Sequence, residues 1–254
     1  MVSSNLVLHR GARPVTADEL KEYRAPQPEG RWFPVAHSRV LETVTATLQD
    51  SGYEIRNTRL GLSREGARFF GTLDLGTSVA SGVTLAVGVR NSVDKSFPLG
   101  FAAGSRVFVC DNLAFRSELL VRRKHTVNGE RNFVRAIAGA VTSLTSFKEA
   151  EGDRIRRLLH LELTDDQADA LILRSFERGV IGARELPKVL HEWRNPAFEE
   201  FQPRTAWSLL NAFTSALRER AVSQPASFAV QTIQLNGLLD RKSTGTEPLA
   251  TLAV

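Results

Sequence analysis

Two neighbouring stretches decide the fold: Ala67-Arg-Phe-Phe-Gly-Thr-Leu-Asp-Leu75 and Val83-Thr-Leu-Ala-Val-Gly-Val-Arg90. Apolar residues recur at every second position in both, which is the period of a β-strand with one buried face. The segment between them begins and ends with glycine and is short enough for a hairpin. The sequence therefore predicts two adjacent antiparallel strands.

Further strands extend this pair on both sides. A strand at 53–62 precedes it, and segments 97–101, 106–110 and 119–125 are predicted to follow in the same sheet. Val107-Phe-Val-Cys110 is apolar on both faces and is the best candidate for a central strand. Residues 100–106 are rich in glycine but lack the Gly-Lys-Ser/Thr ending of a phosphate-binding loop, so they are predicted to form a turn between strands.

Helical spacing of apolar residues flanks the strands. It predicts one helix from residue 37 to residue 50, where Ser51-Gly52 stops it, and one long helix that follows Asn128-Gly129 and reaches about residue 151. Later helices are predicted at 165–178, 183–193, 204–222 and 226–239. An N-terminal helix, an antiparallel hairpin sheet, a long helix across that sheet and a helical C-terminal half make an α+β fold.

The same patterns divide the chain into four parts. Residues 1–35 are predicted to be an extended arm, in which Thr16 caps a short helix and several prolines then prevent regular structure. Residues 36–160 form the α+β core with its antiparallel sheet, and 161–239 form a helical region packed on that core. Residues 240–254 are expected to be a flexible tail.

Composition bounds the class of protein. The chain has 254 residues, of which 42% are hydrophobic and 24% charged, which is ordinary for a globular protein large enough to bury a core without metals or disulfides. It contains no apolar run long enough to cross a bilayer and no signal-peptide core near Met1. Cys110 is the only cysteine. We therefore expect a cytoplasmic protein without cofactors.

The balance of charge is basic. The formal net charge is +5, and only six of the 33 basic residues are lysines. Arginine is the better side chain for binding phosphate, although a GC-rich genome also raises its frequency. Residues 101–135 hold seven basic and three acidic residues, so most of the excess lies where the last strand meets the long helix. An acidic partner such as nucleic acid is expected.

This segment supplies the candidate binding residues. Arg122-Arg-Lys-His125 places four cationic or titratable side chains in a row, and Arg131 and Arg135 share one helical face just beyond them. The alternative is a solvated strand edge whose charges prevent aggregation. Cations also interleave with phenylalanines between residues 90 and 116, as in surfaces that stack unpaired bases, although core packing explains the phenylalanines equally well. The predicted nucleic-acid-binding set is Arg90, Lys95, Arg106, Arg122, Arg123, Lys124, His125, Arg131 and Arg135.

Catalytic and metal-binding signatures are missing from the sequence. Cys110, Asp111 and Asn112 offer a thiol, a carboxylate and an amide in a row, but no histidine lies at ligand spacing from them. We expect Cys110 to fill the core and the other two to form a turn. The protein is therefore not expected to be an enzyme, and an unrecognised site near Asp111 with His125 is the alternative.

Four motifs carry a family resemblance. They are Gly88-Val-Arg-Asn-Ser-Val-Asp-Lys-Ser-Phe97, Phe108-Val-Cys-Asp-Asn-Leu-Ala-Phe115, Arg122-Arg-Lys-His-Thr126 and Thr205-Ala-Trp-Ser-Leu-Leu-Asn-Ala-Phe-Thr214. In this order they resemble a phage- and plasmid-associated family of unknown function, number nine hundred and thirty-two. The match covers most of residues 36–222, and the arm and tail diverge. The resemblance implies mobile elements and work on DNA.

A weaker resemblance concerns architecture alone. A helix, a sheet of hairpins and a long following helix are similar to the core of single-strand annealing proteins of the Redβ and Erf type, which form rings that bind single strands along a basic groove. We therefore expect a non-catalytic protein that binds single-stranded nucleic acid, DNA rather than RNA, in recombination, replication or repair of mobile DNA. Strand annealing and assembly into a homo-oligomer, with a ring as one form, belong to this expectation. The other alternative is a protein-interaction module of a mobile element, related to anti-restriction or defence.

Overall fold

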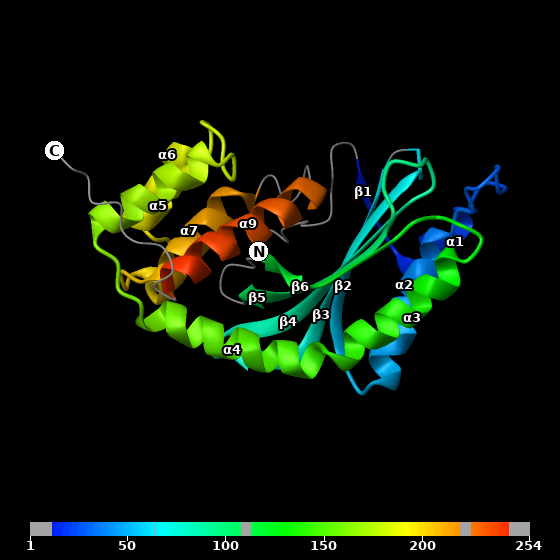
Figure 1. Cartoon of the computed structure of the whole chain (residues 1–254), viewed down its shortest axis with the longest axis horizontal. Helices are drawn as coiled ribbons and strands as arrows, with labels where there is room; N and C mark the ends of the chain where they lie inside the picture. Colours follow the sequence, from blue (N-terminus) through cyan, green and yellow to red (C-terminus); the bar gives the residue numbers. More distant parts are fainter. Residues whose placement is uncertain (1–11, 64, 108–112, 219–224, 244–254) are drawn as a thin grey trace.

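The protein is described by a computed structural model that covers residues 12–63, 65–107, 113–218 and 225–243 (Figure 1). It has the predicted α+β fold. Its elements in chain order are β1 (Arg13–Val15), α1 (Ala17–Glu22), α2 (His37–Asp50), β2 (Ile55–Leu62), β3 (Arg68–Ala80), β4 (Val83–Ser92), β5 (Leu99–Val107), β6 (Leu113–Arg123), α3 (Gly129–Thr142), α4 (Leu144–His160), α5 (Asp165–Glu177), α6 (Leu186–Arg194), the 3-10 helix η1 (Glu199–Phe201), α7 (Ala206–Ala216) and α9 (Pro225–Ser243).

The strands form one six-stranded sheet in the order β1-β2-β3-β4-β5-β6, and each is antiparallel to the next. The hairpin predicted between β3 and β4 is confirmed, with Phe70 opposite Arg90. Further across the sheet, Arg90 lies opposite Gly100 of β5, and Gly100 lies opposite Arg122 of β6. This register brings residues more than thirty positions apart in the sequence onto neighbouring parts of one sheet.

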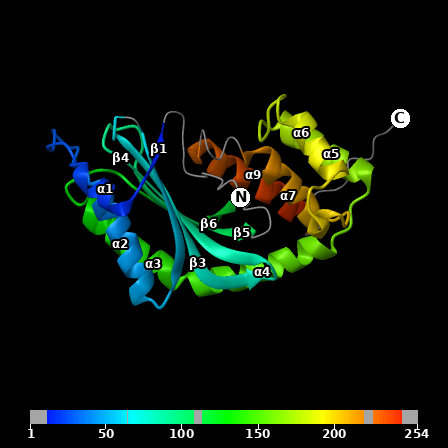
Figure 2. The same cartoon turned by 180° about the vertical axis from the view of Figure 1, so that it is seen from behind.

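Two helical layers cover the two faces of the sheet, as the opposite views of Figure 1 and Figure 2 show. Alternate residues of β4, including Leu85 and Val87, pack with α2 and α3 into one core, to which Phe133 and Ile137 of α3 belong. The opposite face contributes Ala86 and other residues to a second core with α4, α5, α6, α7 and α9. Successive residues of β4 thus point to opposite faces of the sheet and belong to two different cores.

The predicted long helix is divided in two at Ser143. The hydroxyl of Ser143 donates to the Gly139 carbonyl over 3.1 Å, and that of Thr142 donates to the Ala138 carbonyl over 3.0 Å. Such bonds from hydroxyls to the preceding turn bend helices. The division has a structural role, because α3 packs in the first core, whereas α4 passes from the first core, at Leu144 and Phe147, to the second, at Ile155 and Leu158.

Strand β5 differs from the prediction in two ways. Residues 100–106 are the interior of β5, so the predicted turn is wrong. Gly100 has no side chain, and this leaves room for the Arg90 side chain to lie across it. A Cβ atom added at Gly100 would lie only 2.9 Å from Cγ of Arg90. The proposed central strand at 107–110 is not confirmed: Val107 ends β5, residues 108–110 lie outside the described ranges, and β3 and β4 occupy the middle of the sheet.

The ends of the described chain are more regular than predicted. Within the arm, β1 pairs with β2 at the edge of the sheet, and Thr16 caps α1 as expected, with its hydroxyl accepting from the Glu19 amide over 3.1 Å. At the other end α9 continues to Ser243, so the predicted tail begins later than residue 240, and 244–254 lie outside the described ranges. Of the helices in the described ranges, none combines the length and the apolar character that a membrane span requires.

Candidate nucleic-acid interface

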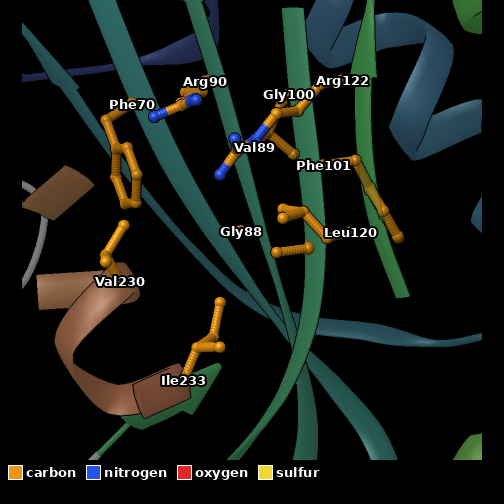
Figure 3. A pocket seen from close by; sticks show the side chains of 11 residues that line it. Phe70, Gly88, Val89, Arg90, Gly100, Phe101, Leu120, Arg122, Val230 and Ile233 are labelled. Atoms are coloured by element: carbon orange, nitrogen blue, oxygen red, sulfur yellow. The ribbon is translucent and has the colours of Figure 1, made fainter. Parts of the chain in front are cut away.

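Two arginines face each other on the sheet surface that looks toward α9 (Figure 3). Arg90 of β4 and Arg122 of β6 are separated by Gly100, and the Arg90 side chain lies across that glycine. Cζ of Arg90 lies 5.3 Å from the ring centroid of Phe97, within the range of a cation–π contact. Burial lowers the pKa of Arg90, and the charge of Arg122 lowers it further. Arg122 thus places a second positive charge beside that of Arg90, and both attract anions.

Mostly apolar residues surround Arg90 and Arg122. We call this surface, which has a small volume of about 40 Å³, the arginine groove. Its lining residues are Phe70, Gly88, Val89, Arg90, Gly100, Phe101, Ala102, Leu120, Arg122, Val230 and Ile233. In Figure 3, Val230 and Ile233 of α9 point toward the sheet, where Gly88 and Gly100 carry no side chain above the backbone. Among the described residues, no carboxylate forms an ion pair with either arginine of the groove. The groove therefore combines positive charge that no described carboxylate neutralises with an apolar lining.

A larger opening adjoins the groove at the end of strands β4 to β6. We call it the loop cleft, with a volume of about 700 Å³. Three segments form it: the turn at 29–32, the loop from β4 to β5, and the residues that follow β6. Phe97 links the two surfaces because it lines the cleft and contacts Arg90 of the groove. The lining residues are Glu29, Arg31, Trp32, Lys95, Ser96, Phe97, Pro98, Lys124, His125 and Thr126.

Backbone hydrogen bonds hold the cleft in shape. The amide and carbonyl groups of Glu29 and Trp32 bond to each other over 2.9 Å, and Gly30 between them has a φ of +57°. The next amide, of Phe33, donates to the His125 carbonyl over 3.1 Å, which ties the N-terminal segment to the end of β6. The cleft thus depends on a contact between segments more than ninety residues apart.

The loop opposite this turn is equally constrained. The hydroxyl of Ser92 donates to the Phe97 carbonyl over 2.7 Å and accepts from the Phe97 amide over 2.9 Å. Lys95, at the tip, has a φ of +64°, a left-handed conformation that residues with a Cβ atom adopt rarely. Strained residues of this kind cluster at ligand sites, where the surrounding structure holds them in place.

Lys95 makes two contacts across the cleft. Its Nζ atom lies 2.5 Å from Oε2 of Glu29 and 4.9 Å from the ring centroid of Trp32. The hydrogen bond from Lys95 lowers the pKa of the Glu29 carboxyl. Both side chains remain more than half exposed, so water screens the pair and its net stabilisation is small. An anion that enters the cleft can therefore compete with Glu29 for Lys95.

Two residues that line the cleft have buried polar atoms without a well-aligned partner among the described residues. Nε1 of Trp32 and both ring nitrogens of His125 are shielded from solvent, and none makes a well-aligned hydrogen bond among the described residues. His125 is only 7% exposed. Burial lowers its pKa, while the backbone of Phe97 acts in the opposite direction. Unsatisfied groups of this kind are rare in native structures and call for a physical explanation.

The structure brings together five of the nine predicted residues. Arg90 and Arg122 line the groove, and Lys95, Lys124 and His125 line the cleft. The surface has two further members that sequence reasoning missed, Arg31 and Trp32, because the arm containing them showed only prolines and irregular backbone. The Gly30-Arg-Trp-Phe33 run was the available signal, since it combines a turn residue with a cation and aromatic rings.

The other four predicted residues lie elsewhere. Arg106 is 3% exposed and donates to Asp74, so it is not available on the surface. Arg123 is exposed at the end of β6 and bonds to the Arg122 carbonyl over 2.7 Å. Arg131 and Arg135 are exposed on α3, whose other side packs against the sheet face opposite to the groove. The prediction of one continuous path through all nine residues is therefore not met geometrically.

The described residues also limit which metal or catalytic sites the structure can show. Within the ranges that the structure covers, no cluster of three or more His, Cys, Asp and Glu side chains is placed to hold a metal ion. The alternative enzyme site near Asp111 falls outside the described residues. The arrangement of groove and cleft can bind an anion and provide hydrogen-bond donors beside aromatic rings.

Comparison with known proteins identifies one relationship. A search of curated proteins and a search of solved structures each found no match. The family model of a domain of unknown function, DUF932, matches residues 28–238, a span that includes the whole of the arginine groove and the loop cleft. Because the match covers most of the chain, this protein belongs to the DUF932 family.

Proposed function

We propose that the protein binds single-stranded nucleic acid along the surface formed by the arginine groove and the loop cleft. One observation carries the proposal: five cations gather around Trp32 and Phe97 at one end of the sheet, and of the described residues that line either surface, Glu29 is the only acidic one. Cations attract the phosphate backbone, and their contacts release counterions from it. The five cations are Arg31, Arg90, Lys95, Arg122 and Lys124.

A single strand fits this surface better than a duplex. Phe97 and Trp32 are partly buried and lie in or beside recessed openings. Bases in a duplex are stacked on one another, whereas the bases of a single strand are free to enter such openings and contact aromatic rings. DNA is the proposed partner in preference to RNA, in line with the mobile-element context of the family resemblance.

Salt-dependent binding tests the proposal. We expect a labelled oligonucleotide without secondary structure to bind at low ionic strength, with an affinity that falls as salt is added. In Arg122→Ala/Lys124→Ala, the slope of log K against log salt should fall by about 0.7 for each phosphate that the variant no longer neutralises. Arg157→Ala/Arg184→Ala is the matched control, because it removes two exposed arginines of the helical region. Equal slopes in the two double variants, or no binding by the wild type, would refute the proposal.

The wider role follows from the same binding activity. We propose that the protein acts in the cytoplasm in recombination, replication or repair of mobile DNA, with strand annealing as its activity and a homo-oligomer as its working form. Self-assembly is supported by Leu173 and Phe176, which are three positions apart on α5 and are 52% and 38% exposed. Light scattering on the wild type and on Leu173→Ser/Phe176→Ser tests it: a monomer in both cases would exclude self-assembly through α5.

A further inference from the structure

We propose that the loop cleft is a pocket for one nucleotide unit, with the phosphate at its cationic rim and the edge of the base at Trp32 and His125. The inference rests on the proposed binding of single strands and assigns a specific task to one part of that surface. A volume of about 700 Å³ lies in the range typical of small-molecule sites.

The rim of the cleft favours a phosphate. Arg31, Lys95 and Lys124 line the cleft, and Glu29 is the one carboxylate among the described lining residues. Glu29 occupies Lys95 through the 2.5 Å contact, so its carboxylate stands where an anionic ligand would bind. The phosphate of a nucleoside monophosphate offers three acceptor oxygens and more charge than a carboxylate, so it is a stronger partner for the same ammonium group. A phosphodiester within a strand carries a single charge and competes with Glu29 through contacts to several cations of the rim.

The interior of the cleft favours a base. Nε1 of Trp32 is a donor only, whereas a neutral histidine ring has one donor and one acceptor nitrogen. Within the described residues these atoms make no well-aligned hydrogen bond, although the Phe97 backbone acts on the His125 ring. All three are shielded from solvent, so a base reaches them only when the two side chains turn toward the cleft. The edge of a base presents carbonyl oxygens, ring nitrogens and amino groups, so it can satisfy donors and an acceptor together. Inorganic phosphate alone has no base edge or ring to offer and leaves most of the pocket unfilled.

The position of Lys95 makes the pocket ready for a ligand. Its left-handed backbone, its contact with Trp32 and its bond to Glu29 hold the ammonium group at the entrance before any ligand arrives. Glu29 acts as an internal competitor that the phosphate displaces. Removal of the Glu29 charge should therefore strengthen binding, whereas removal of a merely structural ion pair would leave it unchanged or weaken it.

Titration with small probes tests the pocket. We would add thymidine 5′-monophosphate, thymidine and inorganic phosphate separately and follow tryptophan fluorescence, with Trp32→Phe as the blank for the signal from the cleft. We expect the monophosphate to bind at least about tenfold more tightly than either fragment, because only it reaches both the rim and the interior.

Variants that change the charge of the rim then test whether the rim residues bind the phosphate. Glu29→Gln should tighten monophosphate binding by roughly threefold to tenfold, and Lys124→Ala should weaken it by a similar factor. Glu130→Gln is the matched control, because Glu130 also forms an exposed ion pair, with Arg39, at a distance of 2.7 Å, and it does not line the cleft. Equal effects of Glu29→Gln and Glu130→Gln would overturn the inference.

The outcomes separate this inference from the proposed function. If an oligonucleotide binds but the monophosphate leaves the Trp32 signal unchanged, the nucleotide pocket is wrong and single-strand binding stands. If the monophosphate binds and no oligonucleotide does, the pocket is supported for free nucleotides and single-strand binding is wrong. Failure of both probes would overturn both.

Discussion

Nε of Arg106 donates a hydrogen bond to Oδ1 of Asp74 over 2.6 Å, on a face of the sheet where the arginine is almost fully buried. The other carboxylate oxygen, Oδ2, accepts from Arg59 and Asn57 over 3.2 Å each. One carboxylate therefore joins β2, β3 and β5. This arrangement gives Arg106, which the sequence marked as a phosphate ligand, a role in the stability of the sheet.

We predict that Asp74→Ala strongly destabilises the protein. It leaves the buried Arg106 charge without its main partner, and loss of one member of a buried pair typically costs about 3–5 kcal/mol. Denaturant unfolding followed by circular dichroism measures the change. Asp153→Ala is the control: Asp153 pairs with Arg156 on the exposed surface of α4, and its loss should cost roughly 0.5 kcal/mol or less. Similar losses in both variants would contradict the proposed importance of the buried pair.

The position of α3 predicts which cations matter for binding. Arg131 and Arg135 lie on the layer that covers the sheet face opposite to the groove. Arg131→Ala/Arg135→Ala should therefore leave the salt slope of oligonucleotide binding nearly unchanged, while Arg122→Ala/Lys124→Ala lowers it. Fluorescence anisotropy over a series of salt concentrations measures both slopes. A larger effect of the α3 variant would favour the path that the sequence alone suggested.

Two glycines of α3 should respond to alanine in opposite ways. A Cβ atom at Gly129 would lie 2.5 Å from the Lys124 carbonyl oxygen, so Gly129→Ala must disturb the turn from β6 to α3. We expect a loss of roughly 1–3 kcal/mol, typical of overpacking, together with weaker oligonucleotide binding because Lys124 moves.

Gly139 has open space around the position of a Cβ atom, so Gly139→Ala should stabilise the helix by about 0.5–1 kcal/mol. Thermal and denaturant unfolding of both variants provide the test. Destabilisation by Gly139→Ala would show that α3 is constrained by more than its own backbone.

A buried histidine predicts a stability that depends on pH. His37 is held between the Asn91 amide, which donates to Nδ1 over 3.0 Å, and the Gly66 carbonyl, which accepts from Nε2 over 2.9 Å. The ring is thus neutral. Burial lowers the pKa of His37 to about 4, which the bond to Gly66 only partly opposes.

The sign of the effect follows from this pKa. Between pH 6.5 and about 4 the unfolded chain binds a proton at His37 that the folded chain does not bind, so stability falls as the pH is lowered through this window. The contribution is fully present above pH 6.5 and is on the order of 3 kcal/mol. His125 acts in the same direction because burial lowers its pKa too.

Unfolding free energies measured from pH 7.5 to pH 4 check this prediction. His37→Gln should be less stable than the wild type at pH 7.5, and the difference should shrink toward pH 4. His191→Gln, at an exposed position of α6, is the control and should change the profile little. A wild-type profile parallel to that of His37→Gln would show that His37 does not titrate as described.

Local patterns in the sequence were sufficient for most elements. The helix predicted at 37–50 is α2 with the same bounds, because its apolar spacing and the Ser51-Gly52 stop are both contained in that stretch. The helix predicted to start at 165 is α5, which begins with a capping box between Thr164 and Gln167. The β3–β4 hairpin followed from alternation and a short glycine-bounded turn. Each of these features depends on neighbours within a few residues.

The misplaced features depend on distant partners. Residues 100–106 contain the small residues typical of a turn, yet they form a strand because their backbone pairs with β4 on one side and with β6 on the other. The charge of Arg106 is visible in the sequence, but its partner Asp74 is not identifiable there. Arg131 follows Lys124 closely along the chain, and the turn between them nevertheless takes it to the other layer.

The sequence by itself determined the α+β class, the antiparallel order of its hairpins and the basic character of the segment around Arg122. Only the tertiary structure decided which cations share a surface, and it joined Arg31 and Trp32 of the arm to Lys95 and Lys124. The physical reason is that periodicity, caps and turns arise from short-range geometry along the chain. The neighbours of a charged side chain are instead set by strand register and by the packing of helices on opposite faces of the sheet.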